Sequence, residues 1–390
     1  MPGGAGRDMS SLRLAAGLMS GTSMDGIDAA LIETDGRRHV RPLAAATVPY
    51  DRAFRARLRS VLGERGPVAE VERELTDRHA EAIRRLLADA GVAAAEVAVA
   101  GFHGHTILHD PAHRRTRQIG DGARLAAAIG IDVVADFRSA DVAAGGQGAP
   151  LAPGYHAALA AGLERPLAVL NLGGVGNVTW IGAHDDDLLA FDTGPGNALI
   201  DDWVAAHADM AFDAGGALAA RGHVRKEALV RLLDNPYFAR RPPKSLDRDE
   251  FGAAPCNGLS AADGAATLAA FTVAAVAAGV AHLPAPPRRW LVTGGGRHNE
   301  TLLAGLAHAL GVPVAPVEAV GWDGDALEAQ AFAWLAVRAL DGQPLSWPGT
   351  TGVPVPRTGG RFFRADRQAN TPAATGPELS RGATGKAVTT

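Results

Sequence analysis

The sequence predicts an α/β protein built from two duplicated halves that face each other across a cleft. Two observations support this fold class. The same order of elements, three turn-linked strands followed by helix–strand–helix–strand, occurs twice along the 390 residues. A glycine-rich turn also follows the first strand of each half. Because ligands often bind between two lobes, we expect these turns to border a shared cleft.

The first half consists of short apolar runs separated by turn residues. The runs "LRLAAGL" and "IDAALIET" are typical of strands, and Gly, Ser, Thr and Asp lie between them. A longer segment carries leucine and isoleucine at helical spacing. The expected strands are 12–18, 27–34, 40–48, 97–102 and 131–135, and the expected helices are 72–90 and 121–129.

The second half repeats this order over a longer stretch of chain. Its additional residues are expected within 205–260, where "RRPPKSLDRDEFG" is typical of an irregular excursion. A last helix is expected at 326–340. The other expected elements are strands at 167–172, 178–181, 188–192, 289–293 and 313–317, and helices at 262–280 and 299–310.

The two ends of the chain differ in character from the middle. Residues 1–11 are predicted to be a flexible arm, and 356–390, which lack periodicity and are rich in Thr, Ala, Gly and Arg, a disordered tail. Between them we expect an N-terminal lobe over 12–150 and a C-terminal lobe over 151–355, with the insertion near 205–260.

The bulk composition argues against several classes of protein. A net charge of -4 and the lack of a dense Lys/Arg run argue against a nucleic-acid partner. We find no uninterrupted apolar stretch of about 18 residues and no secretory signal, so we expect no membrane partner and a cytoplasmic location. A single cysteine, Cys256, rules out an internal disulfide and a cysteine-based metal cluster.

Three glycine-rich turns are candidates for binding an anion. They are "SGTSMDG" at 20–26, "GGVGN" at 173–177 and "GGGRHN" at 294–299. Glycine lets backbone N–H groups approach an anion closely, although each turn taken alone can equally be a simple tight turn. Their equivalent places in a duplicated fold favour phosphate binding. The P-loop, the dinucleotide-binding glycine motif and the protein-kinase motifs are absent from the sequence.

Two acidic residues are candidates for chemistry, each with a structural alternative. Asp192 ends a predicted strand before "TGPGN", where a carboxylate can accept a proton or bind Mg²⁺ through water. It can equally bond the backbone of the following turn. Glu328 lies three residues after Asp325, at the spacing of a helix capping box.

Polar residues at two further positions favour a sugar-like ligand. His103, His105 and His109 follow a strand, but no further ligand lies at metal-site spacing, so we favour hydrogen bonding to a substrate and predict no metal-ligating residues. Arg138 and Gln147 lie in a glycine-rich loop of the kind that orients polar ligands. A structural ion pair is the alternative role of Arg138.

Over roughly residues 13–355, a series of motifs resembles the anhydro-N-acetylmuramic acid kinases. The motifs are "GLMSGTSMDGID", "FHGHT", "DFRSADVAAGGQGAPLAP", "LNLGGVGNVT", "FDTGPGNALID", "TGGGRHN" and "GWDGDALEAQAFAWLA". The resemblance implies two ribonuclease-H-like lobes, as in the ATPase superfamily of hexokinase, actin and heat-shock chaperones. It also implies conversion of 1,6-anhydro-N-acetylmuramic acid, ATP and water to N-acetylmuramic acid 6-phosphate and ADP, in recycling of cell-wall sugars.

The resemblance assigns roles to individual residues. It implies that Asp192 is the catalytic base, that Arg138, Glu328 and His105 contact the sugar, and that Mg²⁺ bridges the phosphates of ATP. The residues implied to bind ATP are Gly21, Thr22, Ser23, Met24, Asp25, Gly26, Ile27, Asp28, Gly173, Gly174, Asn177, Gly294, Gly295, Gly296 and Asn299. A homodimer is a further family expectation. A kinase for another sugar and an actin-like or chaperone-like ATPase are the alternative functions.

Overall fold

The first lobe is formed around a mixed sheet that contains both chain-adjacent and distant strands. The computed structural model describes residues 12–365 except Thr22 and 247–249, so the predicted arm 1–11 and the tail from 366 onward lie outside the described residues. The sheet order is β12-β6-β4-β1-β2-β3, and β5 pairs with β4. Its strands are β1 Arg13–Ser20, β2 Gly26–Thr34, β3 Val40–Pro49, β4 Val97–Asp110, β5 Arg115–Ile119, β6 Val133–Ala135 and β12 Arg361–Phe363.

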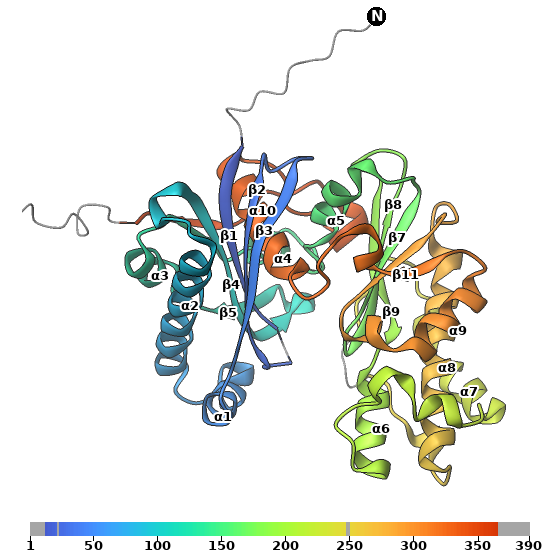
Figure 1. Cartoon of the computed structure of the whole chain (residues 1–390). Helices are drawn as coiled ribbons and strands as arrows, with labels where there is room; N and C mark the ends of the chain where they lie inside the picture. Colours follow the sequence, from blue (N-terminus) through green and yellow to red (C-terminus); the bar gives the residue numbers. More distant parts are fainter. Residues whose placement is uncertain (1–11, 22, 247–249, 366–390) are drawn as a thin grey trace, which may run out of the picture.

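The second lobe repeats the central topology of the first. Its sheet order is β11-β10-β7-β8-β9, with β8 antiparallel to both neighbours and β10 and β11 parallel to β7. The first lobe has the same arrangement. Strand β2 is antiparallel to both of its neighbours, β1 and β3, while β4 is parallel to β1 and β6 is parallel to β4. The strands are β7 Leu167–Leu172, β8 Val175–Ile181, β9 Leu188–Pro195, β10 Trp290–Thr293 and β11 Val314–Pro316. The predicted fold class of two duplicated ribonuclease-H-like lobes is confirmed (Figure 1).

Helices cover the outer faces of the two sheets, and further helices lie between the lobes (Figure 1). In the first lobe α2 packs against α3 and the sheet, and its end is fixed by Gly91 in the left-handed conformation. In the second lobe α8 packs against α6, α7, α9 and β9. The helices are α1 Arg52–Ser60, α2 Val68–Ala90, α3 Gly122–Ile129, α4 Ser139–Ala143, α5 Pro153–Leu159, α6 Ala198–Ala208, α7 Lys226–Leu233, α8 Ala261–Gly279, α9 Glu300–Leu310, α10 Leu327–Leu340 and α11 Pro348–Thr351.

Helix α10 differs from its predicted place. The sequence assigns it to the C-terminal lobe, 151–355, but it packs on β1, β2 and β4 of the first sheet. Glycines on the strands make this close approach feasible, because a Cβ at Gly17 would lie 1.8 Å from the carbonyl oxygen of Ala329. A Cβ at Gly101 would lie 2.0 Å from the carbonyl oxygen of Phe332. Residues 327–340, which lie within the segment predicted as the C-terminal lobe, therefore pack on the sheet of the first lobe.

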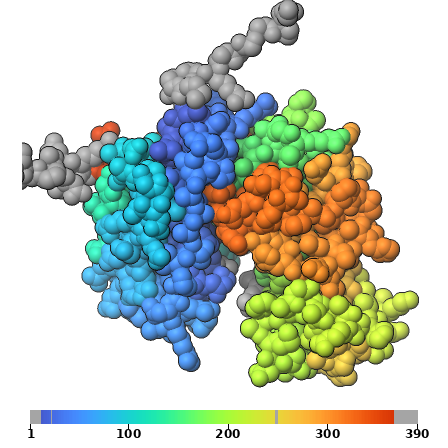
Figure 2. Space-filling view, viewed as in Figure 1, coloured from blue at the N-terminus to red at the C-terminus, as the bar shows by residue number. Residues whose placement is uncertain are grey.

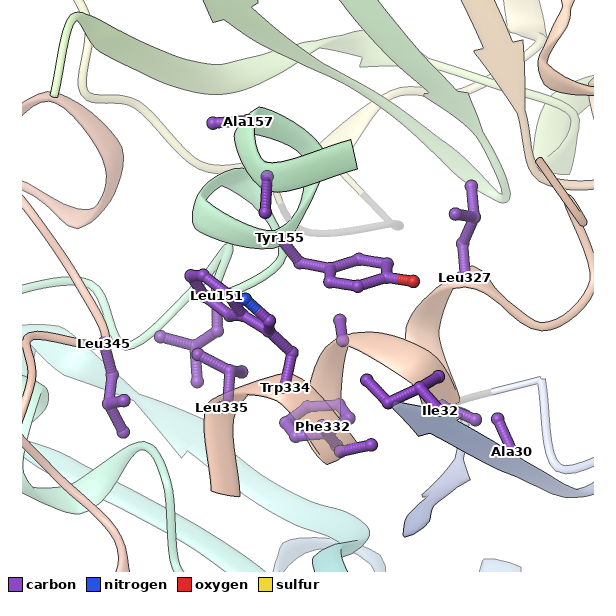
Figure 3. Packing of buried hydrophobic residues seen from close by; sticks show 14 of the residues in the cluster. Ala30, Ile32, Leu151, Tyr155, Ala157, Leu327, Phe332, Trp334, Leu335 and Leu345 are labelled. Atoms are coloured by element: carbon purple, nitrogen blue, oxygen red, sulfur yellow. The ribbon is translucent and has the colours of Figure 1, made fainter. Parts of the chain in front are cut away.

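The core around α10 joins the lobes. Figure 3 shows Phe332 and Trp334 of α10 beside Ile32 of β2 and Tyr155 of α5. The same buried cluster continues into the second lobe through Val169 of β7. Burial of large side chains at this junction contributes about 1.5–3 kcal/mol for each one.

The start of the predicted tail is also structured. Residues 356–365 are described, and β12 pairs antiparallel with β6 at the edge of the first sheet. Phe363 packs over Gly122, where a Cβ would lie 2.5 Å from its ring. The short "RFF" run shows no periodicity of its own, so the tertiary contact decides its structure.

One helix contradicts the expectation that no segment is apolar enough to cross a membrane. Ala261–His282, which is α8 with its following turn, has sufficient length and hydropathy. Leu268 and Phe271 of this helix lie fully in the second-lobe core with Phe191 of β9. Its apolar character is accounted for by packing inside the protein.

Candidate active site

The β1–β2 turn forms one side of the site and is closed by its own backbone. The Met24 N–H donates to the carbonyl oxygen of Gly21 at 3.0 Å, and Met24 has a φ of 58°. Ser20 at its base is fixed by the Tyr50 hydroxyl, which donates to Ser20 Oγ at 2.9 Å. A Cβ at Gly21 would meet nothing closer than 3.6 Å, so the space beside this turn is open.

Asp28 follows this turn on β2 and concentrates negative charge at the cleft. Its Oδ1 accepts a hydrogen bond of 2.7 Å from Thr47. Burial raises the pKa of Asp28 against the effect of this hydrogen bond, and Asp325 and Asp25 raise it further. A cation at this position would relieve the repulsion among the carboxylates.

The β7–β8 turn is the counterpart in the second lobe. The Asn197 N–H donates to the Gly173 carbonyl at 2.7 Å, and the Gly196 N–H donates to the Gly174 carbonyl at 2.9 Å. Added Cβ atoms would find their nearest neighbours at 3.7 Å for Gly173 and 3.6 Å for Gly174. Packing of the protein itself therefore does not require glycine at either position, which favours close approach by a ligand.

The third turn follows β10 and has mixed roles. Gly294 has a φ of 73°, and a Cβ there would lie 2.2 Å from Asn171 Oδ1, so the fold itself requires this glycine. Gly295 has open space, with its nearest neighbour at 3.8 Å. Asn299 is 7% exposed and caps α9 by accepting from the Leu302 N–H at 3.0 Å. The amide oxygen of Asn299 is therefore engaged by the helix cap.

Asp192 lies on β9 at a small cavity. In the β8–β9 ladder it is the partner of Asn177, so both side chains share one face of the sheet. The cavity measures about 110 Å³, room for a few water molecules or part of a ligand. Its lining residues are Gln147, Ala149, Pro150, Asn177, Asp192, Pro243, Lys244, Ser245 and Thr350. The sequence alternative, a bond to the backbone of the following turn, is not the contact found: Oδ2 accepts from the Leu246 N–H at 2.8 Å.

The surroundings of Asp192 adjust its affinity for a proton. Burial raises its pKa to about 7, against the opposing effects of the Leu246 hydrogen bond and the Lys244 charge. A base with a pKa near neutrality can both accept a proton from water and be regenerated. This makes Asp192 the strongest candidate for proton transfer at the cavity.

Arg138 and Glu328 come together at the first lobe. Arg138 donates from Nη1 to the Gly148 carbonyl at 2.7 Å and from Nε to His103 at 3.0 Å. Burial lowers the pKa of Arg138 to about 10, against the nearby Glu328 and Asp141 carboxylates. Glu328 reaches solvent in the cleft, yet the surrounding protein raises its pKa and Arg138 opposes this rise.

The capping alternative for Glu328 is wrong. No side chain caps α10, and the N–H groups of Asp325 and Ala326 are bound instead by Asp323 Oδ1 at 3.1 and 3.3 Å. The Glu328 carboxylate is therefore available to a ligand. The alternative role of Arg138, a structural ion pair, is found only as an electrostatic attraction to Glu328 and Asp141. No salt bridge joins these three described residues.

His105 occupies a different place from the one predicted. It is 0% exposed, and its Nδ1 lies 3.1 Å from Ser20 Oγ. Burial lowers its pKa to about 4, so the ring is neutral at physiological pH. The described structure leaves no exposed atom of His105 for a sugar, and the ring supports the base of the β1–β2 turn through Ser20.

Several residues at the cavity were not predicted as site residues. Lys244 and Ser245 belong to the excursion within 205–260, which the sequence marks only as irregular. Ser245 donates to Gln147 Oε1 at 3.1 Å and so joins the excursion to the loop between the lobes. Thr350 of α11 completes the cavity from the C-terminal segment. No periodicity or motif rule points to residues brought together in this way.

Direct metal ligation finds limited support in the side chains. No group of three or more His, Cys, Asp or Glu residues with suitable geometry occurs among those the structure describes. Mg²⁺ in phosphate-transferring sites is held mainly by water and substrate phosphates, with one or two carboxylates. The charge around Asp28 and Asp25 fits such a shared site.

The cleft between the lobes is open at one end, where Figure 2 shows a hollow between the regions of α1 and α6. Two duplicated lobes, a glycine turn from each of them and a half-buried carboxylate at a cavity define a two-lobed kinase. Residues 13–365 match the family described as anhydro-N-acetylmuramic acid kinase. The chain belongs to this family, whose members are ATP-dependent sugar kinases.

Individual relatives agree with this assignment along nearly their whole length. An anhydro-N-acetylmuramic acid kinase of Paramagnetospirillum magneticum is 63% identical over 351 residues, which cover 89% of this chain and 99% of the relative. The corresponding protein of Rhodospirillum rubrum is 60% identical over 356 residues, with 90% and 94% covered. That of Rhizorhabdus wittichii is 58% identical over 360 residues, with 90% and 99% covered.

Proposed function

We propose that the chain joins two bond changes on 1,6-anhydro-N-acetylmuramic acid. Water forms a new bond to C1 while the bond from C1 to O6 breaks, and O6 then takes the γ-phosphoryl group of ATP. The products are N-acetylmuramic acid 6-phosphate and ADP. The observation that supports this most is the Asp192 carboxylate, whose pKa is raised to about 7 by burial at a cavity large enough for water.

Asp192 supplies the base for the first change. Its Oδ2 is held by the Leu246 N–H, and no bond to Oδ1 is found among the described residues, so Oδ1 can accept a proton from water. The resulting nucleophile attacks C1 from the side opposite O6, as in inverting glycosidases. The proton stays on Asp192, and the electron pair of the broken bond stays on O6 for attack on phosphorus.

The glycine turns supply the positioning for phosphoryl transfer. This reaction depends mainly on alignment and on stabilisation of charge. We assign the phosphates of ATP to the segment 21–28, with Gly173, Gly174 and Asn177 opposite, and the adenosine to Gly294–Gly296 and the backbone of Asn299. Bound Mg²⁺ would neutralise phosphate charge, with Asp28 and Asp25 placed to hold it.

Arg138 and Glu328 are the proposed sugar contacts. A guanidinium that is half-buried and already fixed on the Gly148 carbonyl loses little freedom when it binds an oxygen of the sugar. Glu328 can accept from a sugar hydroxyl or amide. We also propose a cytoplasmic location and a homodimer. Light scattering of the purified protein would test the homodimer.

Labelling with ¹⁸O-water tests the coupled reaction. We expect one solvent oxygen at C1 of the 6-phosphate product, measured by mass spectrometry at early times because reducing sugars exchange this oxygen slowly. The matched control is incubation of unlabelled product in the same water. A product that forms without solvent oxygen at C1 would contradict ring opening by water.

Substitution of Gly173 by Ala tests the proposed phosphate turn. The added methyl group has no neighbour closer than 3.7 Å, so we expect unchanged stability. It would nevertheless obstruct a hydrogen bond from the backbone to phosphate, worth about 1.5–3 kcal/mol. We expect the KM for ATP to rise by about ten- to a hundredfold. Gly162→Ala, where nothing lies within 4 Å, is the control; an unchanged KM in Gly173→Ala would remove this turn from the ATP site.

A further inference from the structure

The excursion between α6 and α8 returns to Asp192 and encloses it. The Asp192 N–H donates to the Lys244 carbonyl at 3.0 Å, and the Leu246 N–H donates to Asp192 Oδ2 at 2.8 Å. The Tyr237 hydroxyl donates to the Asp192 carbonyl at 2.6 Å. Both backbone groups and one carboxylate oxygen of Asp192 are thus held by a segment of ten residues, 237–246.

The Lys244 side chain is buried within this segment. It is 6% exposed, and its ammonium donates to the carbonyls of Tyr237 at 3.1 Å and Phe238 at 3.4 Å. It also lies 4.5 Å from the centre of the Tyr237 ring. These contacts are all with neutral groups, which offset only part of the cost of burying a charge. A nearby anion would offset a further part of this cost.

Asp192 is that anion. No salt bridge of 4.0 Å or less joins the two described side chains, and both line the same cavity. Burial and the Arg240 charge lower the pKa of Lys244 to about 8, and Asp192 opposes this. The separation leaves space at the carboxylate for water, while the ammonium still acts on it through a medium of low polarity.

Other charged groups around this segment act on its remaining residues. The Arg240 guanidinium lies 5.5 Å from the centre of the Tyr237 ring, and the Glu250 charge raises the pKa of the Tyr237 hydroxyl. His282 Nε2 lies 3.0 Å from the Phe238 carbonyl. The other polar side chains at the cavity are neutral, namely Gln147, Asn177, Ser245 and Thr350. Among the described residues, Lys244 is therefore the charge that acts on the Asp192 carboxylate.

We propose that Lys244 is a positioning residue for the reaction. Its ammonium holds Asp192 in the ionised form that accepts a proton from water, and the backbone of 244–246 orients the carboxylate toward the cavity. This inference rests on the proposed role of Asp192 as the base. A solely structural Lys244 would instead affect folding or rate by the same factor at every pH.

The pH dependence of kcat distinguishes these roles. In the parent enzyme kcat should fall below about pH 7 as Asp192 becomes protonated. In Lys244→Gln, which keeps a hydrogen-bond donor without the charge, we expect this acidic limb to move up by about one pH unit, with roughly tenfold lower activity below it and recovery above it. Lys244→Arg, which keeps the charge, should show the parental limb.

Controls make each outcome decisive. A variant that is partly unfolded loses activity by the same factor at every pH, so the position of its acidic limb is not affected by the folded fraction. Lys244→Met provides a second uncharged variant. Equal, pH-independent losses in the Gln and Arg variants, or an unmoved limb in both uncharged variants, would overturn the proposal. Full activity of Asp192→Asn would instead refute the base itself, so the two failures are distinguishable.

Discussion

Asp192→Asn is expected to lower kcat by on the order of 10²–10⁴-fold, the usual contribution of a general base. The amide keeps the size of the carboxylate, and its oxygen can still accept the hydrogen bond from the Leu246 N–H, which is 2.8 Å long in the parent. It cannot accept a proton from water. Because this substitution leaves the backbone of the glycine turns that we assign to ATP unchanged, the Kd for ATP, measured by calorimetry, should stay at the parental value.

The control for this variant is Asp186→Asn, an exposed aspartate in the turn before β9. It changes the net charge equally in the same lobe and should keep parental kcat. A near-parental rate in Asp192→Asn would mean that another group activates water. Weakened ATP binding in that variant would place the carboxylate at the nucleotide instead.

Gly17→Ala is expected to destabilise the protein by about 3 kcal/mol, the upper part of the usual range for overpacking. The new Cβ would lie 1.8 Å from the Ala329 carbonyl oxygen and 2.6 Å from the Ala333 nitrogen. Both are backbone atoms of α10, so relief requires the helix to move away from β1. Urea unfolding would measure the loss as a lower midpoint.

Gly162→Ala again serves as the matched control, because nothing lies within 4 Å of its added Cβ. Its unfolding midpoint should stay close to that of the parent. An unchanged midpoint in Gly17→Ala would show that α10 does not pack against β1 as closely as the structure indicates.

Local patterns predicted most of the two sheets but not the elements that depend on distant partners. In β5, Arg115 and Arg117 interrupt any apolar alternation, and the strand forms because β4 extends beyond its apolar run to pair with it. Helix α10 is apolar and was predicted as a helix. Its sequence contains no signal for which sheet it covers, since Gly17 and Gly101 supply the matching surface from far along the chain.

The candidate site shows the same division. Motif residues such as Asp192 and Arg138 were predicted from their side chains and their resemblance to a family. Leu246 acts through its backbone N–H, a group that every residue except proline carries, so sequence gives no sign of its role. For His105, a side-chain pattern was correct about polarity but gave the wrong surroundings, because burial depends on the assembled sheet.

The packing of α10 has a consequence for how the protein is made. Six of the seven strands of the first sheet lie within residues 13–135, yet one of its faces is covered by residues 327–340. Domains of a nascent chain usually fold in the order of their synthesis. Here the N-terminal lobe must wait, with apolar strands uncovered, until the ribosome has produced most of the second lobe. Premature termination before α10 would therefore yield a fragment whose first lobe is incomplete and prone to aggregation.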